Sequence, residues 1–170
     1  MGYSTSFTGQ FNLDKPLAPE HKAYLSQFSE TRRMKRDSKL ANTLPDPIRK
    51  AAKLPIGTEG GYFVGAKGFA GQDKDNSVTE YNYPPSGQPG LWCQWVPTED
   101  GTGLGWNNAE KFYEYVEWMR YLIEHFLAPW GYVLNGEVTW QGEDDHDMGK
   151  IILENNTVTT KKGRISYDGD

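Results

Sequence analysis

The chain offers little material for a covalent or metal-centred site. Cys93 is the only cysteine among 170 residues, and the histidines number three. A lone cysteine excludes an intramolecular disulfide and any metal site built from several thiolates. No stretch approaches the ~18 apolar residues that span a membrane, and residues 1–13 lack the basic start and apolar run of a secretory signal. We therefore expect a cytoplasmic protein that has no membrane partner.

The net charge of −5 is small but unevenly distributed. Residues 20–53 carry nine Lys and Arg against four Asp and Glu, whereas residues 54–170 carry eight against eighteen. A basic segment of this kind either meets an acidic partner or lies on the acidic remainder of its own domain. We favour the second interpretation, although the sequence leaves open whether the basic residues 32–39 are docked or free.

Aromatic side chains supply much of the material for a core. Six Trp, ten Tyr and seven Phe make up 14% of the chain. Each buried ring removes about 150–250 Å² of surface from water. A chain with 36% hydrophobic residues therefore has enough apolar surface to fold, and its length fits one domain of ordinary size.

Strands are predicted where apolar and polar residues alternate, because successive side chains of a strand point to opposite faces. The two asparagines at 155 and 156 predict a hairpin, since asparagine tolerates the positive φ of a two-residue turn. The predicted strands cover residues 3–13, 91–96, 104–106, 131–141, 150–154 and 157–161.

Two long helices are predicted as well. The first begins at Pro19, which suits the first helical position, and its pattern fades by Thr31. The second covers 108–127, with Asn107 as its cap and Glu110 completing a capping box. It carries an apolar stripe at i, i+3, i+4 spacing. That stripe contains Phe112, Tyr115, Val116, Met119, Leu122, Ile123 and Phe126, and a third, short helix is predicted over 47–53.

This order of elements indicates an α+β fold. We predict a mostly antiparallel sheet with two main helices on one face and a C-terminal β-hairpin. The order strand–helix–strand–strand–helix–strand is the split βαβ of ferredoxin-like folds, which we take as the candidate topology. Residues 1–165 then form a single domain with an irregular insertion at about 32–90, and residues 166–170 form a frayed tail.

The motifs for metal binding and catalysis are incomplete. The acidic run 143–147 matches only part of an EF-hand loop, because Met148 stands where an acid should precede the glycine. No sequence spacing ties Cys93 to a histidine, as nucleophilic catalysis would need. We therefore predict no catalytic residue, no metal and no cofactor, and we lean against an enzyme.

Two signals of nucleotide or nucleic-acid binding also depart from their patterns. Residues 65–71 contain three glycines, but they meet neither the Walker nor the dinucleotide spacing. The basic residues 32–39 beside exposed aromatics on a ferredoxin-like sheet would imitate an RRM, yet the RNP string is absent. A nucleotide or single-stranded nucleic acid is thus the less favoured partner.

The remaining candidate is a polar loop that leads into a tryptophan strand. A loop as long as 57–90 is uncommon in a small domain and often functional. Polar side chains beside tryptophans make a recognition surface, unless both tryptophans are core. Trp92 and Trp95 lie on opposite faces of a strand, so one of them lies on the face opposite the main core. The candidate partner-binding residues are Arg32, Arg33, Gln72, Asp73, Asn76, Tyr81, Asn82, Trp92 and Gln94.

Four stretches of the sequence are distinctive: GYSTSFTGQFNLDKPL, FSETRRMKR, PPSGQPGLWCQWVP and KFYEYVEWMRYLIEHFLAPWGYVLNGEVTWQGED. In these stretches the chain resembles a set of uncharacterised proteins from bacterial and phage genomes, and the resemblance runs over nearly its whole length. It implies a bacterial or phage setting and brings no activity, cofactor or site residue with it.

The leading hypothesis is a non-enzymatic interaction protein that binds another protein, such as a phage accessory factor, an inhibitor or an immunity-type protein. It is motivated by the lack of catalytic constellations together with an acidic body, a basic segment and a long loop beside tryptophans. The first alternative is an enzyme or sensor that binds a nucleotide-like ligand at residues 65–82. The second alternative is a structural component of an oligomer, and the sequence leaves the oligomeric state open.

Overall fold

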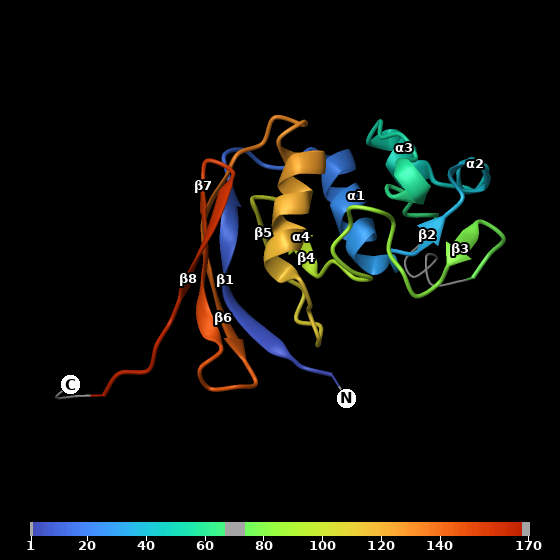
Figure 1. Ribbon diagram of the computed structural model, residues 1–170. Coiled ribbons are helices and arrows are strands. Elements are labelled where there is room, and N and C mark those ends of the chain that lie inside the picture. Colours follow the sequence, from blue (N-terminus) through green and yellow to red (C-terminus); the bar gives the residue numbers. More distant parts are fainter. Residues whose placement is uncertain (1, 67–73, 168–170) are drawn as a thin grey trace.

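The computed structural model describes residues 2–66 and 74–167. Its main sheet has six strands in the order β4-β5-β1-β6-β7-β8, and all neighbouring strands are antiparallel. Helices α1 and α4 lie on one face of this sheet (Figure 1). The predicted α+β class, with a mostly antiparallel sheet and two main helices on one face, is therefore confirmed.

The elements are β1 (Thr5–Leu13), α1 (Pro19–Glu30), β2 (Lys35–Arg36), α2 (Ser38–Ala41), α3 (Pro47–Ala51), η1 (Thr58–Gly60), β3 (Val78–Glu80), β4 (Trp95–Pro97), β5 (Gly103–Trp106), α4 (Tyr115–Leu122), the π-helical turn η3 (Ile123–Leu127), β6 (Leu134–Gly142), β7 (Met148–Glu154) and β8 (Thr157–Lys162).

The strand order interleaves two helical connections. β1 leads through α1 to β4, and β5 lies between these two strands in the sheet; β5 leads through α4 to β6, and β1 lies between them. The ferredoxin-like assignment stays a prediction, and this order agrees with the split βαβ that it requires. The hairpin β7–β8 extends the sheet beyond β6, and its turn residues Asn155 and Asn156 have φ of 47° and 67°.

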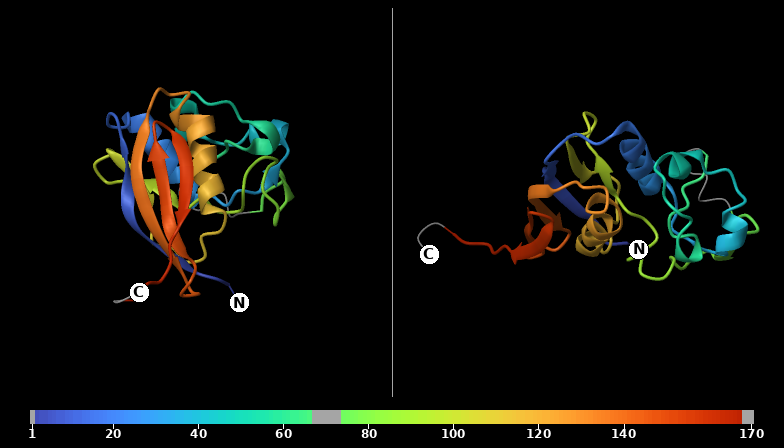
Figure 2. Two further views of the ribbon diagram at one scale, coloured as in Figure 1. Left: turned by 60° about the vertical axis from the view of Figure 1, so that its left-hand side comes forward. Right: turned by 90° about the horizontal axis from the view of Figure 1, so that it is seen from above.

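The segment 31–91 forms a third layer. It holds β2, β3, α2, α3 and η1, and it lies beyond α1 and α4 on the side away from β7 and β8 (Figures 1 and 2). Helix α1 is therefore covered on two sides. Its Gln27 side chain donates to the Val64 carbonyl (3.2 Å), and the Tyr24 hydroxyl donates to the Tyr62 carbonyl (2.8 Å). These bonds to the third layer explain why a polar residue such as Gln27 is buried.

Several element boundaries differ from the prediction, and two of these differences matter for the candidate site. Helix α4 starts at Tyr115, and residues 107–114 before it are irregular. The predicted cap at Asn107 and the capping box with Glu110 are therefore wrong. The strand predicted over 91–96 is also shorter, because β4 covers only Trp95–Pro97.

The core between the sheet and the helices is largely aromatic. Phe7 of β1, for example, meets Trp95 of β4 edge to face with ring centroids 5.2 Å apart. Two side chains outside the predicted stripe of α4, Trp118 and Tyr121, are buried as well. The third layer covers that side of the helix: Gln88 donates through Nε2 to the Tyr121 hydroxyl (2.9 Å). Because both the sheet and the third layer cover α4, its buried surface is wider than the predicted apolar stripe.

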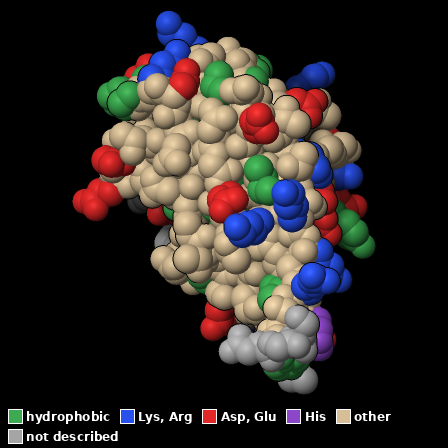
Figure 3. Space-filling view, turned by 90° about the vertical axis from the view of Figure 1, so that its left-hand side faces the viewer, with side chains coloured by type: hydrophobic (Ala, Val, Ile, Leu, Met, Phe, Trp, Pro, Cys, Tyr) green, Lys and Arg blue, Asp and Glu red, His purple; other side chains and the backbone are tan. Residues whose placement is uncertain are grey.

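The opposite face of the sheet is open and polar. Thr8 pairs with Thr139, and Asn12 pairs with Asn135, on the face away from the helices. Figure 3 shows this face as mostly uncharged side chains and backbone. The strands within the described residues direct no aromatic ring to it, so it provides no stacking platform of the RRM type. None of the helices in the described part of the chain is long and apolar enough to cross a membrane.

Candidate binding groove at Trp92

The segment before β4 places two tryptophans in different environments. Trp95 is 1% exposed, and its indole N–H donates to the Tyr115 carbonyl (2.8 Å). Trp92 is only half-buried and borders two hollows of the surface. Trp95 is thus part of the core, whereas Trp92 belongs to the surface.

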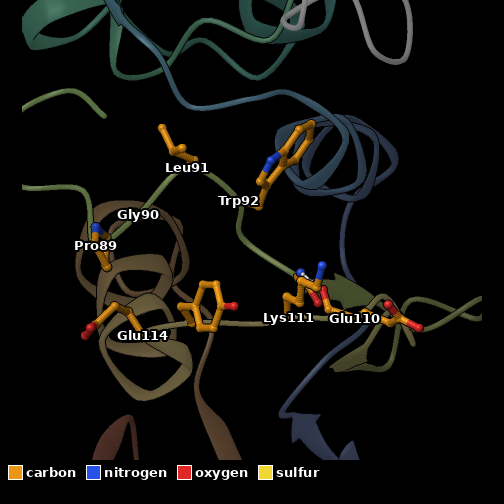
Figure 4. Close-up of a pocket in the computed structure, with 9 residues that line it drawn as sticks. Pro89, Gly90, Leu91, Trp92, Glu110, Lys111 and Glu114 are labelled. Atoms are coloured by element: carbon orange, nitrogen blue, oxygen red, sulfur yellow. Dashed lines mark hydrogen bonds between the residues drawn. The ribbon is translucent and has the colours of Figure 1, made fainter. Parts of the chain in front are cut away.

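The first hollow, of about 410 Å³, lies between two irregular segments (Figure 4). Tyr113 stands at its rim with 51% of its surface exposed, and its hydroxyl accepts a hydrogen bond from the Tyr3 backbone N–H (3.0 Å). The segment before β4 contributes Pro89, Gly90, Leu91, Trp92 and Gln94, and the segment before α4 contributes Glu110, Lys111, Tyr113 and Glu114.

A second hollow, of about 430 Å³, adjoins the first. It shares Trp92, Gln94 and Glu110 with the first hollow and adds Ser29, Glu30, Asn107 and Ala109. We call the two hollows together the Trp92 groove. An aromatic side chain between apolar walls with charged groups at the rim is the usual composition of a protein recognition site.

The segment 107–114 is held in its irregular course by the side chains of Gln94, which directly precedes β4, and Trp106, which ends β5. Gln94 donates through Nε2 to the Glu110 carbonyl (2.9 Å), and Trp106 donates through Nε1 to the Ala109 carbonyl (3.1 Å). These bonds outweigh the local preference for helix. They also fix three residues in the left-handed region, which costs of order 1 kcal/mol each and is typical of functional segments. These are Asn108, Lys111 and Glu114, with φ of 68°, 61° and 56°.

The rim of the groove is acidic. Glu30, Glu110 and Glu114 contribute carboxylates, and Lys111 contributes the single cation among the lining residues. Within the described residues, none of these three carboxylates forms an ion pair. The groove therefore favours a cationic or neutral occupant over an anionic one.

One buried hydrogen-bond donor beneath the groove has no partner. Trp118 is fully buried, and its Nε1 is the buried side-chain nitrogen or oxygen without a hydrogen bond in the described part of the chain. A Cβ built on Gly90 would lie 3.7 Å from this nitrogen and within 4 Å of no other non-neighbouring atom. Gly90 lines the first hollow, whereas the fully buried Trp118 does not.

Three of the predicted partner-binding residues come together outside the groove. The Arg32 guanidinium lies 4.3 Å from the Tyr81 ring centroid and donates to the Tyr81 carbonyl (3.2 Å) and to Asn82 Oδ1 (3.1 Å). Asn76 is exposed. Gln72 and Asp73 lie outside the described residues.

Arg33 has a different environment from its neighbour. It is 2% exposed, stacks over the Phe28 ring at 4.0 Å, and donates to the Gly61 carbonyl (2.7 Å) and the Phe63 carbonyl (2.9 Å). Burial lowers the pKa of its guanidinium. A side chain enclosed in this way supports the third layer and is not available to a partner. The basic segment is thus docked on its own chain, as we favoured.

Of the predicted residues that the structure describes, the groove gathers only Trp92 and Gln94. The sequence analysis missed the rest of the lining because it assigned 108–114 to a helix, 89–90 to the long loop and 91 to a strand. The signal that could have found them is the dense aromatic and proline content of PPSGQPGLWCQW.

Two carboxylates of the acidic run 143–147 accept hydrogen bonds from neighbouring donors. Asp147 accepts hydrogen bonds from the Tyr3 hydroxyl (2.7 Å) and from Trp140 Nε1 (3.0 Å), and Glu143 accepts one from the Ser4 backbone N–H (2.8 Å). Among the residues that the structure describes, no three His, Cys, Asp or Glu side chains form a group that could hold a metal ion.

Cys93 is fully buried. Burial raises the pKa of its thiol to about 12, so it stays protonated at neutral pH. A protonated, enclosed thiol is a poor nucleophile, and Cys93 packs as a small hydrophobic side chain.

Comparisons with known proteins add no identity: no family model, no curated protein and no solved structure matches the chain.

Proposed function

We propose that this chain is a non-enzymatic protein that binds an extended segment of another protein in the Trp92 groove. The observation that carries the proposal is the position of Trp92, half-buried between two hollows whose walls are largely apolar. Tryptophan and tyrosine anchors at the centre of an interface supply a large share of binding energy. We propose a bacterial or phage setting for this partner, for instance as the target of a phage accessory factor, an inhibitor or an immunity-type protein.

The shape of the groove favours a protein segment over a small polar metabolite. Irregular backbone lines both sides of the first hollow, and the two hollows adjoin at Trp92, Gln94 and Glu110. An extended peptide can place neighbouring side chains into adjacent pockets of this kind. The acidic rim also opposes the nucleotide alternative at this groove, because phosphate groups would approach carboxylates.

A photo-crosslinking experiment in the source cells tests the proposal. A benzoylphenylalanine at Tyr113, at the rim of the groove, is compared with one at Thr139 on the open face of the sheet. We expect a covalent adduct with one partner protein from position 113 and none from position 139. Adding Trp92→Ala should abolish the adduct while the thermal unfolding curve stays within a few degrees of wild type.

Three other outcomes would count against the proposal. Equal adducts from both positions, or an adduct that survives Trp92→Ala, would move binding away from the groove. A rise of several degrees in melting temperature with one nucleotide would favour the ligand-binding alternative, because a ligand stabilises the state that it binds. A large assembly in size-exclusion chromatography without any partner would favour the structural oligomer.

A further inference from the structure

One stacked pair of rings joins the helix α4 and its π-helical turn η3 to the third layer. The His125 imidazole lies on the Tyr121 ring, with ring centroids 4.0 Å apart and planes 21° apart. His125 Nδ1 lies 2.9 Å from the Tyr62 hydroxyl oxygen, and Gln88 donates through Nε2 to the Tyr121 hydroxyl (2.9 Å). Tyr62 and Gln88 both belong to the third layer. Two hydrogen bonds between the layers therefore depend on two rings that support each other.

The position of His125 suits a residue that responds to pH. It lies within the π-helical turn η3, and π-helical turns are rare and frequent at functional sites. The ring is half-buried, so protons from the solvent reach it. Histidine is the side chain whose ordinary pKa lies closest to physiological pH. A change of pH can therefore act at the contact between two layers of the fold.

The Tyr62 hydroxyl distinguishes the two forms of His125. A neutral imidazole with its hydrogen on Nε2 accepts the hydroxyl hydrogen of Tyr62 at Nδ1. Protonation places a hydrogen on Nδ1 as well, so both groups then carry a donor hydrogen and the hydroxyl has to turn away. The imidazolium also keeps only part of its hydration in this half-buried position. The closed contact thus favours the neutral ring.

The titratable and charged groups around the ring are Tyr62 and Arg33 of the third layer and Tyr121 and Glu124 of its own helix. Burial lowers the pKa of His125 below its ordinary value of 6.5, although the Glu124 carboxylate acts in the opposite direction. Burial also raises the pKa of Tyr62 and raises that of Tyr121 to about 12, so both hydroxyls stay protonated where a histidine titrates. Arg33 stays one bond away, because its Nε donates to Gln88 Oε1 (3.4 Å).

We infer that His125 is a pH-sensitive latch between the third layer and α4: the neutral imidazole holds Tyr62, and protonation opens this contact and loosens residues 56–64. Because the closed state favours the neutral ring, the latch is strongest above about pH 6.5 and weakens as the pH falls through that value. The latch goes beyond the proposed function, since it operates whether or not a partner lies in the Trp92 groove.

Amide hydrogen exchange of the full ¹⁵N-labelled chain at about pH 7.5 and about pH 5 tests the latch. The reporters are the amides of Tyr62 and Phe63, which donate to the carbonyls of Ile56 and Gly60 (3.0 Å each), and β6 is the reference. After correction for the intrinsic pH dependence of exchange, we expect the reporters to open up to about thirtyfold more at the lower pH. The reason is that an open state with an ordinary histidine pKa gains a proton that the closed state lacks. The reference should stay unchanged.

Matched variants separate titration from structure. His125→Gln cannot titrate at this position, so the reporters should lose the pH dependence. His21→Gln is the control, because His21 also stacks on a ring (Trp130, 3.8 Å) and lies 2.8 Å from the Tyr132 hydroxyl, but outside the third layer. It should keep the wild-type response. Tyr62→Phe keeps the ring and removes the hydroxyl, so it should raise reporter exchange at about pH 7.5 by about two- to tenfold, the size of one hydrogen bond.

The wild-type chain decides the question even if His125→Gln does not fold. Nitrogen NMR signals of the His125 ring should show an unprotonated Nδ1 at neutral pH and a titration midpoint below 6.5, and reporter exchange should begin to rise near that pH. A ring that titrates at 6.5 or above would overturn the inference. So would an unchanged pH response in folded His125→Gln, or an equal loosening of β6, which would mean that acid acts on the whole fold.

Discussion

The sheet with its two helices and the segment 31–91 are held together by different interactions. Between the sheet and helices, aromatic and aliphatic side chains form one continuous buried cluster. In the segment 31–91, three buried arginines instead bind backbone carbonyls and the carboxylates of Asp46 and Asp75. These are Arg33, Arg36 and Arg49, each 3% exposed or less.

The difference shows how a segment with few large apolar residues can still be ordered. Each arginine presents several N–H donors in a fixed plane and so joins separate loops at one point. Arg33, for example, joins the end of α1 to Gly61 and Phe63. Such crosslinks are directional and few, so losing one should open the third layer locally, whereas losing core packing should destabilise the whole fold.

The largest effect should come from the core. Phe126→Ala removes a fully buried ring that packs against Tyr24 and Phe28. We expect a loss of about 3–5 kcal/mol in the free energy of unfolding, through lost transfer energy and a cavity. Urea denaturation followed by far-UV circular dichroism measures it. Leu40→Ala, at a 41% exposed position, serves as the control and should change stability by less than about 0.5 kcal/mol.

Arg33→Ala should cost about 3 kcal/mol, because it leaves the carbonyls of Gly61 and Phe63 buried without a donor. The loss should be local: amide hydrogen exchange should accelerate over residues 57–64 more than in β6. Arg33→Lys keeps the charge and should recover only part of the stability, because an ammonium cannot reproduce the planar fork. Equal acceleration in β6 would contradict the contrast between the two regions.

A smaller effect should follow from relieving backbone strain in the third layer. Lys53 is exposed, follows α3, and has φ of 58°. Lys53→Gly should raise stability by about 0.5–1 kcal/mol, since glycine adopts this conformation without a Cβ clash. Lys50→Gly, three residues earlier inside the helix, should lower stability by a similar amount. Thermal unfolding compares the two variants, and an equal sign for both would refute the strain argument.

The smallest effect concerns the turn between β4 and β5. Hydrogen bonds from Thr102 and Thr98 lower the pKa of the Asp100 carboxyl from 3.8 to about 2. Because the folded pKa lies below the ordinary value, the stabilisation is complete above about pH 4 and is lost as the pH falls through 2. A carboxyl-detected NMR titration should find this value. Thr102→Ala should move the pKa of Asp100 back toward 3.8, and an unchanged value would exclude the proposed cause.

The local sequence pattern was sufficient to predict much of the scaffold. The period-two alternation predicted β1, β6 and the final hairpin, and Asn155 and Asn156 adopt the positive φ that their sequence indicated. Pro19 begins α1 as predicted. These features depend on interactions between residues close in sequence, so periodicity and turn preferences are sufficient to predict them.

The candidate groove could not be predicted in this way. Residues 107–114 carry a helical pattern, but the side chains of Gln94 and Trp106 donate to the carbonyls of Glu110 and Ala109. Arg33 looked like part of a basic surface, whereas the chain encloses it between Phe28 and the carbonyls of 61 and 63. Both outcomes depend on contacts with residues that are distant in sequence, and hydrophobic periodicity does not report such contacts.

The sequence by itself thus determined the α+β class, the position of α1, the long strands and the closing hairpin, because each follows from the spacing of neighbouring side chains. Only the tertiary structure decided that Trp95 is core and Trp92 is surface, that α4 starts at Tyr115, and that the basic segment is docked. The physical reason is the same in each case: burial and competition for hydrogen bonds are set by the layers that pack together, and the third layer lies against the two helices in a way that no local pattern encodes.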